Sequence, residues 1–532
     1  MNKKTLYQKT VPLLSGLTAI GLLAGCSAKS GGDASASTPT GSPAAGSSKA
    51  VTLKVEVFDR GNSPAGMTVT NNGQTKYIQE AFGKPNNINV EFVPVPRAQE
   101  VEKLNVLMAS GDAPDIVFTY DQNLVYKYVQ QGGLTDLGKL VDQYGSNIKS
   151  YVGADTLKLA QFEGKQYAVP AKRMYLGKYS SMIRQDLLDK AGLPAPKTTD
   201  EVYNTLKAFK EKNLASIPLG FSLAAASYEP IIWSFLKKTS EEERYTLMQQ
   251  LGSGEFPLLM PGHKDGVKFL NKLFNEGLMS PDFALDKDKK KLQQDVMTGK
   301  VGMYAEDAAT SYGSTPDIIK VLGSNVAGAK LLPLDPYTNE EGKHTKPGYN
   351  PVGMYVMIPK SSKNAEAAIK YLDWMAQKDV LNRLTNGVEG TNYTLEDGLP
   401  VVKDDQATKD LLYNSGDYRL MSNSGIDFGS LDKNVKSMTL GFPKNQREDA
   451  AKAYANGLTD GMAPVRFDRP LESEAKYGKA LIDKYQELLV KSIMAKPADF
   501  DKVYDAGIKD FMSSGGEEIQ KERKEAYARI KK

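Results

Sequence analysis

Short strand-like stretches alternate with longer helical ones after residue 50. Apolar residues occupy every second position in 51–57 and again in 88–95, which is the period of a half-buried strand. A helical interval lies at 77–82, a helical apolar face runs through 100–110, and a short apolar run follows at 115–118. This succession predicts an α/β protein with helices on both faces of a mixed or parallel sheet.

Charged and aromatic residues follow two of these predicted strands. Asp59 and Arg60 come after the first strand, and Tyr120 and Asp121 come after the third. Ligands of open α/β sheets gather at the carboxyl ends of the strands. The sequence therefore points to these two segments as parts of a ligand site.

The first 25 residues read as an export signal. Lys3, Lys4 and Lys9 precede an apolar run over 11–23, which is too short for a stable transmembrane helix. The next residues, Leu23-Ala24-Gly25-Cys26, end on the only cysteine of the chain and resemble a bacterial lipobox. That resemblance implies a diacylglycerol on Cys26, cleavage before it, and a protein held by lipid on the outer face of the cell membrane. An ordinary secretory signal with an incidental cysteine is the alternative.

Residues 26–50 form the next segment and are almost wholly Ser, Gly, Ala, Thr and Pro. Such a composition buries too little apolar surface to fold, so a flexible tether is predicted. The remaining 51–532 is long enough for two lobes. The 68 basic and 64 acidic residues of the whole chain are interspersed, which gives no sign of a nucleic-acid partner. The mean hydropathy of −0.42 predicts a soluble mature domain.

Several motifs follow one another as in the extracellular solute-binding proteins of carbohydrate ABC importers. These motifs are ASGDAPDIVF at 109–118, GGLTDL at 132–137, GKQYAVP at 164–170, MTGKVGMY at 297–304 and IPKSSKNAEAA at 358–368. This family includes maltose-binding protein. GVEGTNY at 387–393 is similar to a segment found in the family's branch of large lipoproteins. The resemblance covers essentially the whole chain after the tether.

The resemblance implies a periplasmic-binding-protein-like clamp of two α/β lobes joined by crossing hinge strands. The expected limits are lobe 1 at 51–170, lobe 2 at 171–348, a return mainly to lobe 1 at 349–460, and a C-terminal helical region at 461–532 that completes the lobes. Crossings are expected near 168–179 and 349–358, where Gly348, Pro351 and Gly353 provide backbone freedom and direction. A monomer is expected, with an oligosaccharide ligand and permease subunits in the membrane as partners.

The family's pattern also suggests ligand-binding residues. Asp59 and Arg60 match an acidic-basic pair after the first strand, and Tyr120 and Asp121 match contacts after the third. The residues carried over from later positions are Arg173 and Tyr175 at the first crossing, and Glu306 and Asp307 on a loop of the second lobe, where the family's tryptophan is missing. Phe467 and Arg469 are weaker candidates. Arg60 and Arg173 suggest an acidic sugar, since guanidinium matches a carboxylate. A salt bridge to a neighbour such as Asp59 is the alternative, and it is slightly favoured.

The two tryptophans are interpreted differently. Trp233 stands where a second-lobe loop enters a helix, and ligand platform and buried core are equally good interpretations. Trp374 lies in the helix predicted over 365–378, with apolar neighbours at helical spacing, which favours core packing.

No metal or cofactor is predicted. The connection at 210–218 lacks the alternating oxygen ligands of a calcium loop, and lysines within 287–291 oppose a cation beside Asp286 and Asp288. His263, expected in an exposed loop, and His344 are isolated, and there is no nucleophile elbow or phosphate loop. A binding protein rather than an enzyme is therefore expected. A surface glycoside hydrolase with two carboxylates, and a binding protein for a peptide or another small solute, are the alternatives.

Overall fold

The computed structural model describes residues 50–252, 254–308, 310–312 and 317–531. The predicted signal, Cys26 and nearly all of the tether lie outside this range. Within it, no helix has both the length and the apolar character needed to cross a membrane.

The first lobe begins with two paired strands. β1 (Val51–Asp59) pairs in parallel with β2 (Ile88–Pro96), in a register that runs from Val51 opposite Ile88 to Asp59 opposite Pro96. The helix predicted over 100–110 is present as α2 (Glu100–Ser110) and leads to β3 (Val117–Thr119). A parallel bridge between Val55 and Ile116 joins the start of this run to β1. These strands and the helix are thus confirmed close to their predicted limits.

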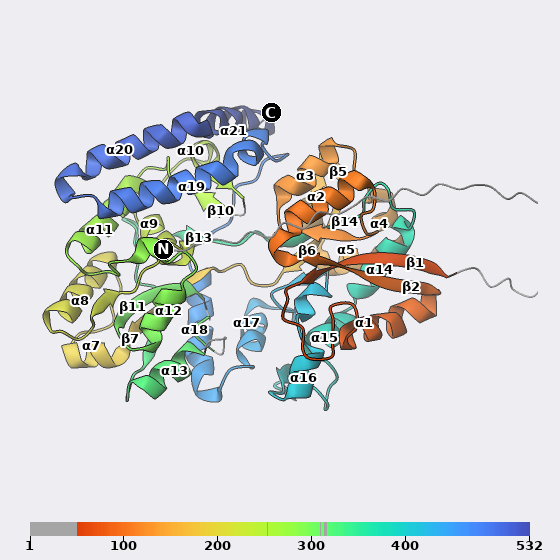
Figure 1. Cartoon of the computed structure of the whole chain (residues 1–532), viewed down its shortest axis with the longest axis horizontal. Coiled ribbons are helices and arrows are strands. Elements are labelled where there is room, and N and C mark those ends of the chain that lie inside the picture. Colours follow the sequence, from red (N-terminus) through yellow and green to blue (C-terminus); the bar gives the residue numbers. More distant parts are fainter. Residues whose placement is uncertain (1–49, 253, 309, 313–316, 532) are drawn as a thin grey trace, which may run out of the picture. The chain divides into compact units, whose positions relative to one another are not determined.

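A four-stranded sheet continues this lobe in the order β17-β6-β14-β3. It contains β6 (Ala168–Arg173), β14 (Val352–Met357) and β17 (Ser422–Asn423), with β14 antiparallel to both β3 and β6. Its helices are α1 (Gly73–Ile78), α3 (Gln122–Gln130), α4 (Gly138–Tyr144), α5 (Ser146–Val152), α6 (Ala154–Lys158), α14 (Ala365–Met375), α15 (Lys378–Asn386) and α16 (Gln406–Leu411) (Figure 1).

The second lobe has its own sheet, in the order β12-β7-β11-β8. Its strands are β7 (Tyr179–Arg184), β8 (Ile217–Leu219), β11 (Val301–Asp307) and β12 (Leu331–Leu334). A small hairpin, β9 (Gln249–Leu251) with β10 (Gly254–Phe256), stands apart from this sheet. The helices are α7 (Gln185–Ala191), α8 (Thr199–Glu211), α9 (Ala225–Ser234), α10 (Glu241–Leu247), α11 (His263–Asn275), α12 (Lys290–Met297) and α13 (Ile318–Asn325).

The chain passes from one sheet to the other between β6 and β7 and again ahead of β14. A Cβ on Gly353 would lie 2.2 Å from Cβ of Asn423, so this glycine permits the close approach of β17. Close approach, rather than the expected backbone freedom, is its role. Within the predicted return, α17 (Leu431–Thr439) precedes α18 (Arg447–Leu458), and α18 packs on β7 and β12 of the second lobe.

Three long helices end the chain: α19 (Glu472–Met494), α20 (Phe500–Phe511) and α21 (Glu517–Ile530). They appear as adjacent blue ribbons in Figure 1, and both α20 and α21 contact α19. Leu481, Leu488 and Phe500 belong to the apolar core of the second lobe.

His263 corrects one expectation. Its ring is fully buried rather than exposed in a loop, with Nδ1 2.8 Å from Oη of Tyr504 and Nε2 3.0 Å from Oη of Tyr485. Burial lowers the pKa of His263 to about 3, so the ring is neutral and joins α11 to α19 and α20.

Candidate ligand-binding pocket

A pocket of about 290 Å³ lies at the carboxyl edge of the first-lobe sheet. Its first-lobe wall includes Arg97 after β2, Tyr120 after β3 and Arg173 at the end of β6. The opposite wall comes from Lys178, from the β9–β10 hairpin and from the segment that leads into α19. The polar and aromatic lining residues of that wall and of the crossing are Gln250, Glu255, Tyr349, Asn350, Tyr355, Arg466, Phe467, Arg469 and Glu474.

Cations outnumber acids in this lining. Five lining residues are basic and two are acidic, Glu255 and Glu474. Arg97 pairs with Glu100, and its guanidinium carbon lies 4.8 Å from the ring centre of Phe58 and 5.0 Å from that of Tyr120. The other four cations make no ion pair with any residue that the structure describes; they are Arg173, Lys178, Arg466 and Arg469. Lys178 still interacts electrostatically with the buried carboxylates of Glu229 and Glu255. The charges of Arg173, Arg466 and Arg469 are therefore the most available to a ligand.

Arg173 is held in place by neutral groups. Its Nε donates to the carbonyl of Asn350 at 3.1 Å, and its guanidinium carbon lies 4.5 Å from the ring centre of Tyr349. Burial lowers the pKa of Arg173, because the charged form is desolvated without a carboxylate to offset the cost. A ligand carboxylate would supply that missing counter-charge.

Two buried polar atoms at the pocket lack a hydrogen-bond partner within the described part of the chain. Oε1 of Glu255 accepts from the backbone of Val465 at 3.2 Å, whereas Oε2 has no partner. Nη1 of Arg466 is likewise unsatisfied. Glu255 is only 4 % exposed, and burial raises its pKa. Orphaned buried atoms of this kind are costly, and a polar ligand would satisfy them.

Comparison with known proteins identifies the family. The model of the bacterial extracellular solute-binding proteins matches residues 69–381, more than half of the chain. The chain belongs to this family. It is a family of binding proteins rather than enzymes, so the glycoside hydrolase alternative is set aside.

Two relatives from Bacillus subtilis (strain 168) resemble this solute-binding protein along most of both chains. Lipoprotein LipO is 24% identical over 475 residues, which is 84% of this chain and 88% of the relative. The polygalacturonan/rhamnogalacturonan-binding protein YtcQ is 24% identical over 466 residues, with coverages of 84% and 87%.

Solved structures establish the periplasmic-binding-protein-like fold. The alginate-binding protein AlgQ2 without calcium ion matches with a TM-score of 0.62 at 22% identity, over 90% of this chain and 98% of the other. The S. pneumoniae binding protein FusA in complex with kestose gives a TM-score of 0.64 at 17% identity, over 90% and 99%.

The sequence-derived candidates of this solute-binding protein divide between pocket and scaffold. Tyr120 and Arg173 line the pocket, as do the weaker candidates Phe467 and Arg469. Asp121 instead caps α3, where its Oδ1 accepts from the backbone of Asn123 at 2.9 Å, and it is not among the lining residues.

Asp59, at the end of β1, and Arg60 after it do not line the pocket. Arg60 makes a two-pronged ion pair with Asp417, with both contacts at 2.8 Å, and Asp59 accepts from the backbone of Gly61 at 2.9 Å. The alternative explanation of Arg60, a salt bridge to a neighbouring residue, therefore holds, but the partner is Asp417 rather than Asp59. The guanidinium of Arg60 is already paired with a carboxylate of the protein itself.

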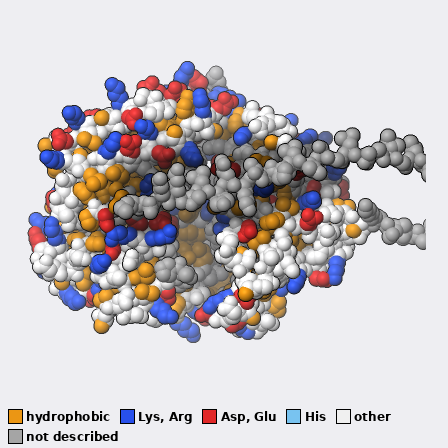
Figure 2. Space-filling model, viewed as in Figure 1, with side chains coloured by type: hydrophobic (Ala, Val, Ile, Leu, Met, Phe, Trp, Pro, Cys, Tyr) orange, Lys and Arg blue, Asp and Glu red, His pale blue; other side chains and the backbone are white. Residues whose placement is uncertain are grey.

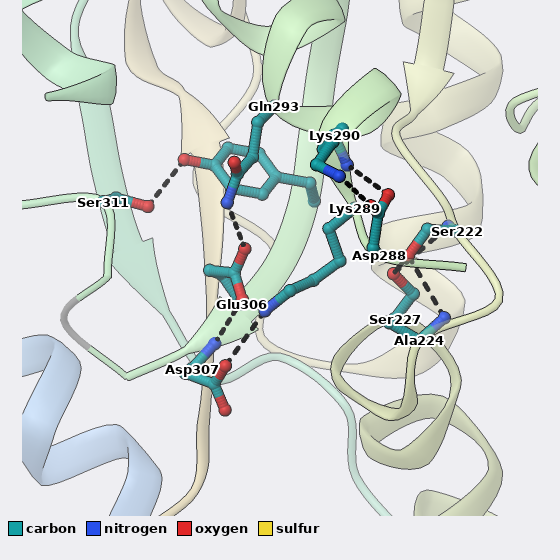
Figure 3. Close-up of polar contacts among 11 residues, drawn as sticks. Ser222, Ala224, Ser227, Asp288, Lys289, Lys290, Gln293, Glu306, Asp307 and Ser311 are labelled. Atoms are coloured by element: carbon teal, nitrogen blue, oxygen red, sulfur yellow. Dashed lines mark hydrogen bonds and ion pairs between the residues drawn. The ribbon is translucent and has the colours of Figure 1, made fainter. Parts of the chain in front are cut away.

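Glu306 and Asp307 end β11 beside Lys289 (Figure 3). The ammonium of Lys289 pairs with the 1 % exposed Glu306 and lies 3.0 Å from Oδ2 of Asp307. Asp307 is half exposed and lines a second cavity of about 270 Å³ together with Tyr175. Oη of Tyr175 donates to the carbonyl of Tyr454 at 2.7 Å. This second cavity shares Lys178 and Tyr349 with the pocket.

Trp233 requires a correction. Its side chain is 0 % exposed and packs with Leu236, Met248 and Met260 in a small core, so it offers no face to a ligand. Trp374, as expected, packs on the first-lobe core, against Phe82 and Tyr371.

Sequence reasoning missed Arg97, Lys178, Glu255 and Arg466. Arg97 follows the end of β2 as Arg60 follows the end of β1, so the strand-end rule would have found it. No local pattern marks the others, because their places in the pocket depend on contacts between distant segments.

The candidate cation loop is internally satisfied. Oδ2 of Asp286 accepts from the backbone of Leu292 at 2.8 Å, and Asp288 pairs with Lys290. Across the described ranges, no three His, Cys, Asp or Glu side chains are placed to hold a metal ion.

Proposed function

We propose that this protein is the lipid-anchored binding component of a carbohydrate ABC importer and that it captures an acidic oligosaccharide in the pocket at Arg173. The observation that carries the proposal is the set of three pocket arginines, Arg173, Arg466 and Arg469, that make no ion pair among the described residues. Guanidinium groups bind planar carboxylates through paired, charge-assisted hydrogen bonds. The aromatic rings of Tyr120, Tyr349 and Phe467 offer apolar faces to sugar rings.

Two further observations support this choice of ligand. A relative that covers most of the chain is named for binding polygalacturonan and rhamnogalacturonan, and both polymers contain uronate residues. On the face shown in Figure 2, Lys and Arg are mixed with Asp and Glu, whereas five lining residues of the pocket are basic and two are acidic.

The lobes would respond to such a ligand as a clamp. The pocket is lined from the first lobe, from the hairpin of the second and from the C-terminal segment. A ligand that contacts all of them only when they approach shifts the population toward the closed form. A permease that prefers the closed form would then distinguish loaded from empty protein.

Arg173→Ala tests the ligand class. Calorimetry with tri-galacturonate is expected to show a loss of about 1.5–3 kcal/mol in binding free energy, because a charge-assisted hydrogen bond to the carboxylate is removed. A neutral trisaccharide should lose less. Added salt should weaken tri-galacturonate binding to the wild type.

Lys172→Ala is the matched control, because it removes a neighbouring positive charge that pairs with Asp427 at 2.9 Å and does not line the pocket. It should leave both affinities nearly unchanged. Equal wild-type affinity for acidic and neutral trisaccharides, with no effect of salt, would exclude the acidic ligand.

Cys26→Ser tests the lipid anchor. The variant lacks the thiol that receives diacylglycerol and is expected to move from the membrane fraction to the medium or soluble envelope. Immunoblots of the separated fractions measure this, with Ser30→Ala in the tether as a control that stays membrane-bound. Retention of the Cys26→Ser protein at the membrane would contradict lipid anchoring.

A further inference from the structure

The segment that leads into α19 supplies a large part of the pocket wall. Its contributors include Arg466, Phe467, Arg469 and Glu474. Yet this segment has little regular structure of its own before residue 472. Contacts with other elements of the fold must therefore hold these side chains in place.

The start of α19 lacks a cap from its own sequence. Leu471 occupies the N-cap position and provides no side-chain hydrogen bond. Glu522 of α21 supplies the acceptor instead: its carboxylate accepts from the backbone of Glu472 at 3.0 Å and of Ser473 at 2.8 Å, and also from the Ser473 hydroxyl. The first N–H groups of a helix need such partners, and a carboxylate there also interacts favourably with the helix dipole.

Arg523, the next residue of α21, reaches the pocket wall itself. Its side chain is 0 % exposed and its Nη1 pairs with Glu474, whose same oxygen accepts from the backbone of Gln250 at 3.1 Å. The guanidinium carbon lies 4.9 Å from the ring centre of Phe467. Glu474, Gln250 and Phe467 all line the pocket.

Arg523 is also fixed from behind. Its Nε donates to the carbonyl of Tyr245 in α10 at 2.7 Å. Arg523 thus contacts α10, the ring of Phe467 and Glu474 in the first turn of α19, and Glu474 in turn binds the β9–β10 hairpin. A planar guanidinium can make its three contacts at once, whereas an ammonium cannot.

We propose that α21 is an integral part of the ligand pocket, with Glu522 and Arg523 as positioning residues that hold the 464–474 wall. This inference rests on the proposed function, in that the pocket is taken as the ligand site. Neither residue lines the pocket; they act through Glu474, Phe467 and the start of α19.

The test compares Arg523→Lys and Glu522→Gln with two controls on the same helix. Lys524→Arg exchanges the same two cations at an exposed position, and Glu525→Gln changes an exposed glutamate. Both controls alter a cation or an acid on the surface of α21, away from the contacts that Glu522 and Arg523 make. Affinity for tri-galacturonate and amide hydrogen exchange of residues 464–474 are measured for the full chain.

Arg523→Lys is expected to weaken tri-galacturonate binding about tenfold or more and to speed amide exchange in 464–474, with exchange in β1 and β2 unchanged. Glu522→Gln should act in the same direction but less, since its amide oxygen still accepts one N–H. The controls should match the wild type. A general structural role would lower the melting temperature without a selective rise of exchange in this segment.

Wild-type affinity and exchange in both positioning variants would overturn the inference. If Arg523→Lys does not fold, Glu522→Gln decides by the same two measurements. If the wild type itself does not bind tri-galacturonate, the proposed function fails, and the exchange rates of 464–474 still decide whether α21 holds this wall.

Discussion

Replacing Trp233 with alanine is expected to lower the free energy of unfolding by about 3–5 kcal/mol. The indole is completely buried against Leu236, Met248 and Met260, so its removal leaves a cavity as well as a loss of buried apolar surface. Urea unfolding measures the effect, and Trp374 remains as the fluorescent reporter. Because Trp233 presents no surface to the pocket, the affinity of the folded variant for oligosaccharide should stay at the wild-type value.

Trp233→Phe is the matched variant, since it keeps an aromatic ring in the same core and should cost much less. The opposite pattern would contradict this assignment. A Trp233→Ala protein of wild-type stability that has lost its ligand would make Trp233 the binding platform after all.

The stability of the protein is expected to fall as the pH rises from about 5 to about 8, by about 3–5 kcal/mol in total, because of Glu56. Glu56 lies on β1 and is 1 % exposed; its Oε2 accepts from the backbone of Phe118 at 2.9 Å and its Oε1 has no partner in the described residues. Burial raises the pKa of Glu56 from 4.5 to about 8, against smaller opposing effects of the Phe118 hydrogen bond and of Arg97.

The free energy of unfolding falls with rising pH because the folded chain binds the Glu56 proton more tightly than the unfolded chain does. Below pH 4.5 the folded and unfolded chains both hold the proton, so Glu56 contributes no pH dependence. Between 4.5 and about 8 only the folded chain holds it, and each pH unit lowers stability by up to about 1.4 kcal/mol. Above about 8 the loss is complete.

Glu56→Gln should remove this slope and make the variant more stable than the wild type at pH 9. Urea unfolding of both proteins at pH 5, 7 and 9 measures the difference. An identical pH profile for the two proteins would show that Glu56 is not the responsible group.

The elements of the first lobe were predictable because each carries its own local pattern. The period-two alternation of β1 and the helical face of α2 are set by residues only a few positions apart. The tendency of ligands to bind at the carboxyl ends of strands likewise predicted Tyr120 as a site residue, and applied to β2 it would also have predicted Arg97.

The rest of the pocket depends on contacts that no local pattern records. The Glu255 carboxylate accepts a hydrogen bond from the backbone of Val465, 210 residues away in the sequence. In the same way, Arg60 is kept out of the pocket by its ion pair with Asp417, 357 residues away. Trp233 is a different case. The sequence left ligand platform and core equally open for it, and only the folded structure decides, because the helix around it is buried on nearly every side.

The contact between α21 and the start of α19 also sets an order of events during synthesis. All residues that line the pocket, from Arg97 to Glu474, leave the ribosome before Glu522 and Arg523 do. A nascent chain that has reached Glu474 therefore carries every lining side chain while the first turn of α19 is uncapped and Glu474 has no counter-ion from α21. The contacts that complete the 464–474 wall are thus the last to become possible as the chain is made.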